Sequence, residues 1–203
     1  IKKCIIDKDI SYKPVWLMRQ AGRYLPEFRE IRKKNQNFIN LCLNTELVPK
    51  ITLQPVKRFD LDAAIIFSDI LMIPYGLGQD VNFNKGLGPS LGSIDKNALL
   101  KTQEEVFKRK LNPIYSSIKI TSENEMLKNK DLIGFVGAPW TLLVYIINKA
   151  SPKKNIKQNF FSDQSLIDEL LELLVKYIKI HILNQIKSGA TIIQVFDSWA
   201  GLL

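Results

Sequence analysis

The stretch that decides the fold is L-I-G-F-V-G-A-P-W-T-L-L-V-Y-I-I at residues 132–147. Its first five residues are almost all apolar, which is typical of a strand buried on both faces in a parallel sheet. Pro139 follows at a position where the first turn of a helix tolerates proline, because the amide hydrogen that proline lacks has no helical partner there. The stretch therefore predicts a strand over 132–136, a tight turn, and a helix over 140–147.

The same order of strand and helix recurs on both sides of this stretch. Apolar runs predict further strands at 15–18, 62–66 and 191–196, and half of a small hairpin at 81–84. Helices are expected at 26–34, 46–58, 102–120 and 165–187, the last with Gly189 as its C-cap. Strands that alternate with helices indicate a parallel α/β protein. Four of the strands end in polar or glycine-rich residues, as at the mouth of a (β/α) barrel.

The length sets how much of a barrel this chain supplies. It has 203 residues, of which 46% are hydrophobic, and this composition allows a normal core. A whole (β/α)₈ barrel takes about 250 residues. We therefore expect residues 1–203 to form a single domain that is the N-terminal portion, roughly the first half, of a TIM (β/α)₈ barrel, after an extended lead-in at 1–13. Such a portion is expected to be inactive by itself and to associate through its open sheet edge.

Charge and composition exclude several classes of function. The net charge is +9, but the lysines are scattered and form no block of five or six like charges, so no nucleic-acid-binding tail is predicted. One histidine and two cysteines without a C-x-x-C pair offer no metal-site spacing. The glycine-rich stretch 71–93 has neither a third spaced glycine nor a following G-K-[ST], so no nucleotide site is expected there.

The sequence also predicts no membrane span. Its longest apolar stretch, 133–147, is interrupted by glycines and a proline and is too short to cross a bilayer. No secretory signal is visible. The expected compartment is therefore the cytoplasm, or a plastid if an import segment precedes the sequence.

Two arginines follow the strand expected at 15–18. Arg19 and Arg23 stand on either side of Gly22, which permits a sharp turn and a close approach of a ligand. Guanidinium groups offer paired donors to carboxylate or phosphate and keep their charge at any physiological pH. Taken alone, the pair is explained more simply as a surface turn with salt-bridged arginines.

Polar side chains also follow other expected strands. If the strand at 62–66 continued, Phe67 and Asp69 would share a face, and Phe196 and Ser198 would do so after the last strand. This pattern suits an apolar pocket with polar contacts at its mouth, to which Tyr145 could add a hydroxyl. Each residue has a simpler explanation: Asp69 and Ser198 can cap turns, and Tyr145 can belong to the core.

Two other polar residues are not candidates for the site. His181 lies within the long expected helix and is interpreted as structural. Asp197 is expected to point away from Ser198, into the helix layer.

Four blocks of the sequence resemble the signatures of one enzyme family. They are P-V-W-L-M-R-Q-A-G-R-Y-L-P-E-F-R at 14–29, I-I-F-S-D-I-L at 65–71, G-F-V-G-A-P-W-T-L at 134–142 and Q-V-F-D-S-W-A-G at 194–201. In this order they are similar to the uroporphyrinogen decarboxylase family, and the resemblance runs from about Lys13 to the last residue. It implies a (β/α)₈ barrel, a homodimer, and removal of the four acetate carboxyl groups of uroporphyrinogen III to give coproporphyrinogen III in heme biosynthesis.

The resemblance also implies the site, without a cofactor or metal. Asp69 would be the catalytic residue and would face the pyrrole N–H groups of the porphyrinogen. By the same resemblance, Arg19 and Arg23 would bind substrate carboxylates, and the backbone of Gln20, Ala21 and Gly22 would line the same contact. Tyr145 and Ser198 would contact the acidic side chains of the substrate, and Arg32 would do so more peripherally. The family has a late substrate-binding histidine that lies outside this sequence, and His181 does not replace it.

Three alternatives stay open. A corrinoid-linked methyltransferase of the same fold would need a zinc site of thiolate and histidine. A catalytically incomplete fragment would share the fold without the activity. A basic binding module for nucleic acid or membrane would show steeply salt-dependent affinity.

Overall fold

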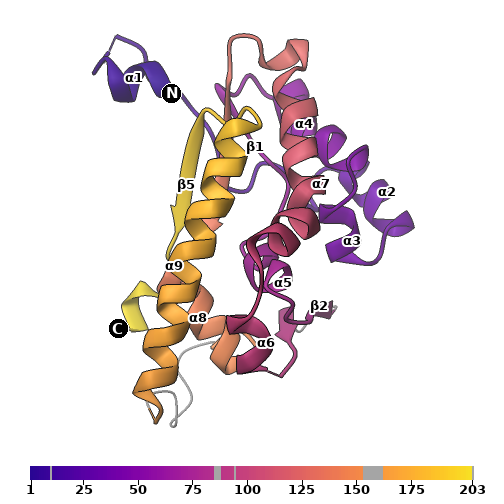
Figure 1. The fold of residues 1–203 in the computed structure, drawn as a ribbon. Helices are drawn as coiled ribbons and strands as arrows, with labels where there is room; N and C mark the ends of the chain where they lie inside the picture. Colours follow the sequence, from indigo (N-terminus) through magenta and orange to yellow (C-terminus); the bar gives the residue numbers. More distant parts are fainter. Residues whose placement is uncertain (10, 85–87, 94, 153–161, 203) are drawn as a thin grey trace. The chain divides into compact units, whose positions relative to one another are not determined.

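The computed structural model describes residues 1–9, 11–84, 88–93, 95–152 and 162–202 (Figure 1). The strands are β1 (Ala63–Ile65), β2 (Val81–Asn84), β3 (Gly88–Leu91), β4 (Asp131–Gly137) and β5 (Ile192–Phe196). The α-helices are α1 (Lys2–Ile6), α2 (Pro26–Lys34), α3 (Phe38–Cys42), α4 (Leu47–Arg58), α5 (Met72–Gly76), α6 (Lys96–Leu100), α7 (Glu104–Ser122), α8 (Pro139–Asn148) and α9 (Gln164–Lys187). Single 3₁₀ turns are η1 (Glu125–Leu127) and η2 (Ala200–Leu202).

The main sheet has the strand order β1-β4-β5. β1 and β4 run parallel, with Ala63 opposite Asp131 and Ile65 opposite Ile133. Parallel neighbours need a crossover, and α7 lies between these two strands in the sequence as α9 lies between β4 and β5. This confirms the parallel α/β class. β2 and β3 form a separate antiparallel hairpin, as expected for 81–84, and residues 85–87 at its tip lie outside the described residues.

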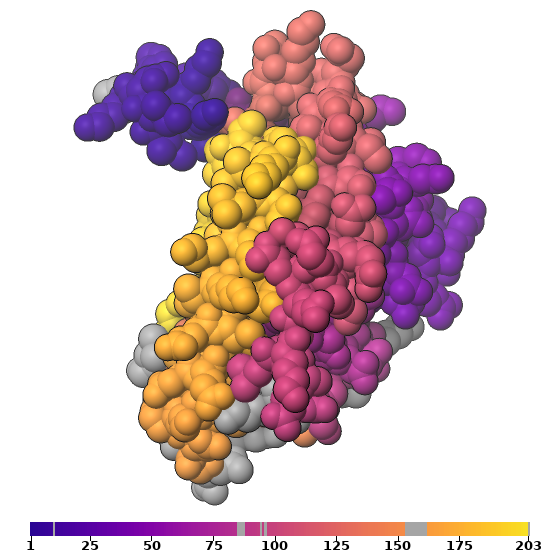
Figure 2. All heavy atoms as spheres, viewed as in Figure 1, coloured from indigo at the N-terminus to yellow at the C-terminus, as the bar shows by residue number. Residues whose placement is uncertain are grey.

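The amino-terminal segment differs from the sequence-based expectation in two ways. The lead-in expected to be extended over 1–13 contains helix α1, which buries none of its side chains and is drawn among the indigo atoms of Figure 2. The strand expected at 15–18 does not form. Val15 accepts a backbone hydrogen bond from Asp62 at 2.9 Å, but the Val15 amide donates to the Asp62 carboxylate at 2.6 Å instead of to a strand. The Asp62 side chain therefore accepts the hydrogen bond that a neighbouring strand would accept in a β-ladder.

The loops contain helices that the sequence pattern did not predict. α3, α5 and α6 are each five residues long, too short to show a helical period. Two of them have a capping side chain: Asn37 accepts from the Asn40 amide and Asp95 from the Ala98 amide. The long helices were predicted within about two residues of their ends, and Gly189 adopts the left-handed conformation (φ +111°) expected of a C-cap.

Residues that are close in space gather into two compact units with interleaved segments. Unit 1 comprises Ile1–Ser68, Pro113–Phe135 and Ile182–Gln194, and unit 2 comprises Asp69–Asn112, Val136–His181 and Val195–Leu203. The single domain expected for 1–203 stays a prediction.

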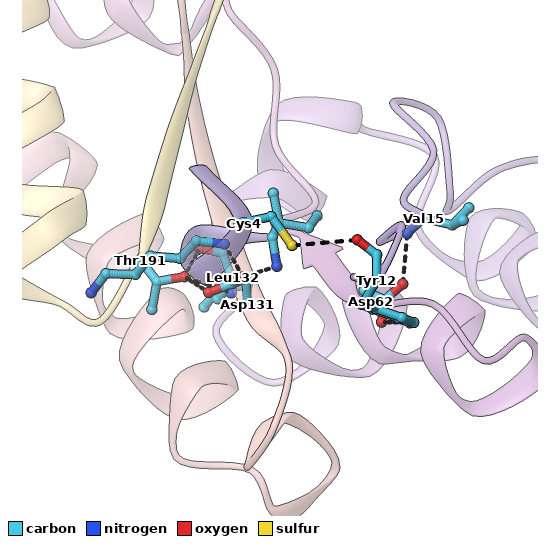
Figure 3. Close-up of polar contacts among 9 residues, drawn as sticks. Cys4, Tyr12, Val15, Asp62, Asp131, Leu132 and Thr191 are labelled. Carbon is cyan, nitrogen blue, oxygen red and sulfur yellow. Dashed lines mark hydrogen bonds and ion pairs between the residues drawn. The ribbon is translucent and has the colours of Figure 1, made fainter. Parts of the chain in front are cut away.

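In unit 1, two aspartates hold the amino-terminal segment at the starts of strands (Figure 3). Asp62 precedes β1 and accepts a hydrogen bond from the Tyr12 hydroxyl. Asp131 opens β4 and accepts from the Lys2 amide at 2.8 Å and from the Thr191 hydroxyl at 2.9 Å. These contacts lie at the amino ends of the strands, whereas Asp69 and Ser198 follow carboxyl ends.

The core of unit 2 is built around Phe107. Its ring lies 4.7 Å from that of Tyr177 and 6.5 Å from that of His181, measured between centroids. The ring also packs against α5, where a Cβ added to Gly76 would come within 2.7 Å of the Phe107 ring. Glycine is therefore required for α5 to pack this closely on α7.

Within unit 1, Gln185 of α9 replaces a strand partner of β4. Its Oε1 accepts from the Phe135 amide and its Nε2 donates to the Phe135 carbonyl, both at 3.0 Å. The side chain is buried, and Gly134 leaves the space for it, because a Cβ there would lie 2.5 Å from Oε1. The glutamine thus supplies hydrogen-bond partners to both backbone groups of Phe135.

We expect Gln185→Leu to lower the free energy of unfolding by about 2–4 kcal/mol, because it leaves both backbone groups of Phe135 without these partners. Urea denaturation of the full-length protein measures the change. Lys179→Leu, at an exposed position of the same helix, is the matched control and should cost less than about 0.5 kcal/mol. Equal effects of the two substitutions would show that the Phe135 contacts add nothing to stability.

Candidate active site

The segment between Leu17 and Leu25 of unit 1 closes into a hydrogen-bonded turn before α2. Gln20 is only 1% exposed, and its Oε1 accepts from the Leu17 amide at 3.0 Å. The Gln20 carbonyl accepts from the Tyr24 hydroxyl, and the Gly22 carbonyl accepts from the Leu25 amide at 3.0 Å. The backbone of this turn is therefore tied internally, with Gln20 as its buried anchor.

Arg19 and Arg23 project from this turn with exposed side chains. Among the described residues neither guanidinium group has an ion-pair or hydrogen-bond partner, so the salt-bridged surface turn is not what these residues form. Only the backbone of Arg23 is engaged, since its carbonyl accepts from the Arg29 guanidinium at 2.9 Å. The turn thus holds two positive charges, four residues apart, that are available to an anionic ligand.

Arg32 is engaged differently. Its guanidinium donates to the carbonyls of Asn35 at 2.6 Å and Gln36 at 3.2 Å, and it lies 5.5 Å from the centroid of the Phe38 ring. These contacts fix the end of α2. The peripheral substrate contact of Arg32 stays a prediction.

In unit 2, Asp69 stands in a turn rather than on a strand. β1 ends at Ile65, so the strand does not continue to Phe67 and Asp69, and the condition under which they would share a strand face is not met. The Asp69 carboxylate accepts from the Leu71 amide at 2.9 Å, which is the turn-capping geometry. The residue is partly exposed, yet burial of its carboxyl group raises the pKa to about 6, against the opposing effect of the Leu71 hydrogen bond. Carboxyl groups with a pKa raised by burial are common at functional sites, so Asp69 stays the candidate catalytic residue.

Tyr145 lies on α8 with its ring 6.1 Å from that of Trp199. Burial raises the pKa of its hydroxyl, and the negative charge of Asp69 raises it further. The structure therefore brings Tyr145 and Asp69 within electrostatic reach of each other in unit 2. Side-chain hydrogen bonds to Trp199 and Ser151 lower the same pKa, and the substrate contact of Tyr145 stays a prediction.

The turn that carries Ser198 is fastened to α8. The Thr141 hydroxyl donates to Asp197 at 2.7 Å and accepts from the Trp199 amide at 3.0 Å, and Trp140 Nε1 donates to the Trp199 carbonyl at 2.9 Å. Asp197 thus points toward the helix, as predicted, and Ser198 is exposed. β5 ends at Phe196, so Ser198 is placed by this turn and not by strand alternation.

The described residues contain no group of three His, Cys, Asp or Glu side chains that could hold a metal ion. Within the same residues, none of the helices has the length and hydropathy that crossing a membrane requires.

Comparison with known proteins decides the family. The sequence profile described as "Uroporphyrinogen decarboxylase (URO-D)" matches residues 1–203. The chain belongs to the uroporphyrinogen decarboxylase family. A protein named uroporphyrinogen decarboxylase from Chelativorans sp. is 43% identical over 192 residues, and one of the same name from Campylobacter jejuni is 41% identical over 200 residues. These matches cover 94% and 97% of this chain but only 56% and 58% of the relatives, so the chain spans little more than half of their length.

The family and a solved structure identify the fold. A methyltransferase from Methanosarcina mazei superimposes with a TM-score of 0.72 at 17% identity, covering 96% of this chain and 57% of the methyltransferase. At this identity the likeness concerns the fold alone. Both are TIM (β/α)₈ barrels, so the chain supplies part of such a barrel, and the expectation of roughly its first half is confirmed.

Sequence reasoning missed residues that support the decarboxylase-family motifs without belonging to the carried-over site. Tyr24, Thr141 and Trp199 lie inside the matched blocks, but nothing in their spacing distinguishes them from packing residues. Their roles follow from hydrogen bonds: Tyr24 to the Gln20 carbonyl, and Thr141 between Asp197 and Trp199.

His181 is structural, as predicted, and this has a measurable consequence. Burial lowers its pKa to about 3, below the unfolded value of 6.5. The neutral form is therefore favoured in the fold, and stability present above pH 6.5 is lost as the pH falls toward 3. At pH 5.5 we expect a loss of about 1.4 kcal/mol from this residue. Unfolding free energies at pH 7.5 and 5.5 test this, and a His181→Gln variant with an equally steep pH dependence would contradict it.

Proposed function

We propose that the protein containing this chain is a uroporphyrinogen decarboxylase, which converts uroporphyrinogen III to coproporphyrinogen III by removing four acetate carboxyl groups. The observation that carries the proposal is the ordered turn with the guanidinium groups of Arg19 and Arg23, which have no ion-pair or hydrogen-bond partner within the part of the chain that the structure describes. An octa-acidic substrate needs such cations, and membership of the uroporphyrinogen decarboxylase family supports uroporphyrinogen as that octa-acid.

The first role of the site is to hold the substrate by its carboxylates. Arg19 and Arg23 each offer paired N–H donors to a carboxylate, and the backbone of Gln20, Ala21 and Gly22 lines the same contact. Tyr145 and Ser198 would donate hydroxyl hydrogen bonds to further acidic side chains. Fixing several carboxylates at once orients one acetate arm for reaction.

The second role is to stabilise charge on the pyrrole ring. Loss of CO₂ leaves an electron pair beside the ring, and prior protonation of the adjacent ring carbon makes the ring its own electron sink. The protonated ring is cationic, so an ionised Asp69 facing the pyrrole N–H groups would stabilise it. A carboxylate that is already desolvated interacts more strongly with this cation than one in water. The pKa of about 6 keeps Asp69 ionised at neutral pH.

Two parts of the proposal concern the whole protein. We propose a homodimer that acts on a porphyrinogen and not on nucleic acid, in the cytoplasm or, after import, in a plastid. Sedimentation of the full-length protein would test the dimer, and a monomer active at the same specific rate would contradict it.

The test of function compares two reactions of the full-length protein. Uroporphyrinogen III is supplied without oxygen, and the products are separated by their number of carboxyl groups, while a methylated corrinoid is tested in parallel. We expect intermediates with successively fewer carboxyl groups and no methyl transfer. Methyl transfer without decarboxylation would instead support the corrinoid-linked alternative.

A further inference from the structure

The arginine turn is held by a side chain that none of the substrate contacts includes. The Tyr24 hydroxyl donates to the carbonyl of Gln20, the residue between the two arginines that is buried as the anchor of the turn. The bond spans four residues and closes the turn from Gln20 to Tyr24. Without it, the described residues leave the Gln20 carbonyl with no other protein donor.

The Tyr24 ring ties the same turn to the rest of unit 1. It packs against Phe59, the C-cap residue of α4, with ring centroids 6.4 Å apart and an interplanar angle of 30°. It also covers Gly22, since a Cβ added to that glycine would lie 3.5 Å from the ring. Ring and hydroxyl therefore act at different points, so removing the hydroxyl alone need not disturb the packing.

Over the described ranges, the guanidinium groups of Arg19 and Arg23 are not held by hydrogen bonds or ring packing as Tyr24 is. The Arg19 and Arg23 side chains are exposed and make no side-chain contact among the described residues that would fix them. The separation of the two guanidinium groups is then set by the backbone of the turn. Small errors in the placement of binding groups cost large factors in rate when a substrate must be held at several points.

We propose that Tyr24 is a positioning residue, whose hydroxyl fixes the turn that carries Arg19 and Arg23 and so sets the spacing of the two substrate carboxylates that they bind. The inference rests on the proposed function and deepens it. It assigns the specificity for a polycarboxylate substrate partly to a residue that need not touch the substrate.

The test is Tyr24→Phe in the full-length protein, with Tyr12→Phe as the matched control. Both tyrosines lie in unit 1, are 52% and 57% exposed, and donate one hydroxyl hydrogen bond, which for Tyr12 goes to Asp62. A purely structural role predicts similar losses of stability and unchanged kinetics for both. We expect Tyr24→Phe alone to lower kcat/KM for uroporphyrinogen about 10-fold, mainly through KM, because one hydrogen bond is worth about that factor.

A double-mutant cycle with Arg23→Gln separates positioning from an independent contact. If Tyr24 acts through the turn, Tyr24→Phe should lower kcat/KM less in the Arg23→Gln background than in the wild type. If the fold-losses in kcat/KM of the two single variants multiply fully in the double variant, the proposal is overturned. The same holds if Tyr24→Phe and Tyr12→Phe have equal kinetics.

A binding measurement distinguishes this failure from failure of the proposed function. Uroporphyrin, the oxidised octacarboxylate, is titrated into each variant and its fluorescence followed. If the wild type does not decarboxylate uroporphyrinogen but Tyr24→Phe weakens uroporphyrin binding about 10-fold and Tyr12→Phe does not, the proposed function fails and the role of Tyr24 stands. Absent or unchanged binding in all three proteins would overturn the role of Tyr24.

Discussion

Asp69→Asn in the full-length protein is expected to lower kcat for uroporphyrinogen decarboxylation by at least about 100-fold, the scale seen when a preorganised electrostatic group is lost. The substitution keeps the shape and the oxygen that accepts from the Leu71 amide, and it removes only the charge. A cationic pyrrole then loses its counter-charge. Initial rates at saturating substrate measure the effect, and a rate within about 3-fold of the wild type would refute the role given to Asp69.

The pH dependence provides an internal control for the same variant. With a pKa of about 6, Asp69 should produce an acid limb in kcat/KM centred near pH 6, because the ionised form is the active one. The variant should lack this limb.

The stability of Asp69→Asn should not fall together with its activity. The folded pKa is raised above 3.8, so ionisation of Asp69 costs stability progressively between about pH 4 and 6 and fully above that range. Asp69→Asn should therefore unfold with equal or greater free energy at pH 8, where it is least active. A variant that is both inactive and clearly destabilised at pH 8 would point to a structural role instead.

The second large effect is expected for the arginines. Arg19→Gln and Arg23→Gln should each lower kcat/KM about 10- to 100-fold, mostly by raising KM, because each removes charged hydrogen bonds to a carboxylate. Arg23→Lys should recover only part of the loss, since an ammonium group is a point charge without the paired donors.

Arg58→Gln is the matched control for charge. Arg58 belongs to the same unit and pairs with Glu27 at 2.9 Å on the surface, so its loss should change kcat/KM by less than about 2-fold. Equal effects of Arg58→Gln and Arg23→Gln would show that net positive charge, and not the turn, attracts the substrate.

The parts of the fold that were predictable depend on long periodic patterns. The strand and helix around Pro139 could be predicted because a buried apolar run meets a helix start. The strand at 15–18 could not be excluded from sequence, because its apolar residues suit a strand, whereas in the structure the Val15 amide donates to the Asp62 side chain. The five-residue helices have no period to detect.

The candidate site, like the fold, has features that the sequence predicts and features that depend on contacts between distant residues. The motifs identified Asp69 and Ser198, but strand alternation was the wrong reason for their placement, since β1 and β5 end before them and turns position both. The hydrogen bond from Thr141 that orients Asp197 joins residues 56 positions apart, and the raised pKa of Asp69 depends on burial. Neither is visible in local sequence.

The most direct test of the central claim is the amount of CO₂ released per uroporphyrinogen III consumed to completion by the purified full-length protein, with a metal chelator present. We expect four molecules of CO₂ per substrate, with coproporphyrinogen III as the final product. Consumption without CO₂, or CO₂ release only when metal is restored, would contradict it.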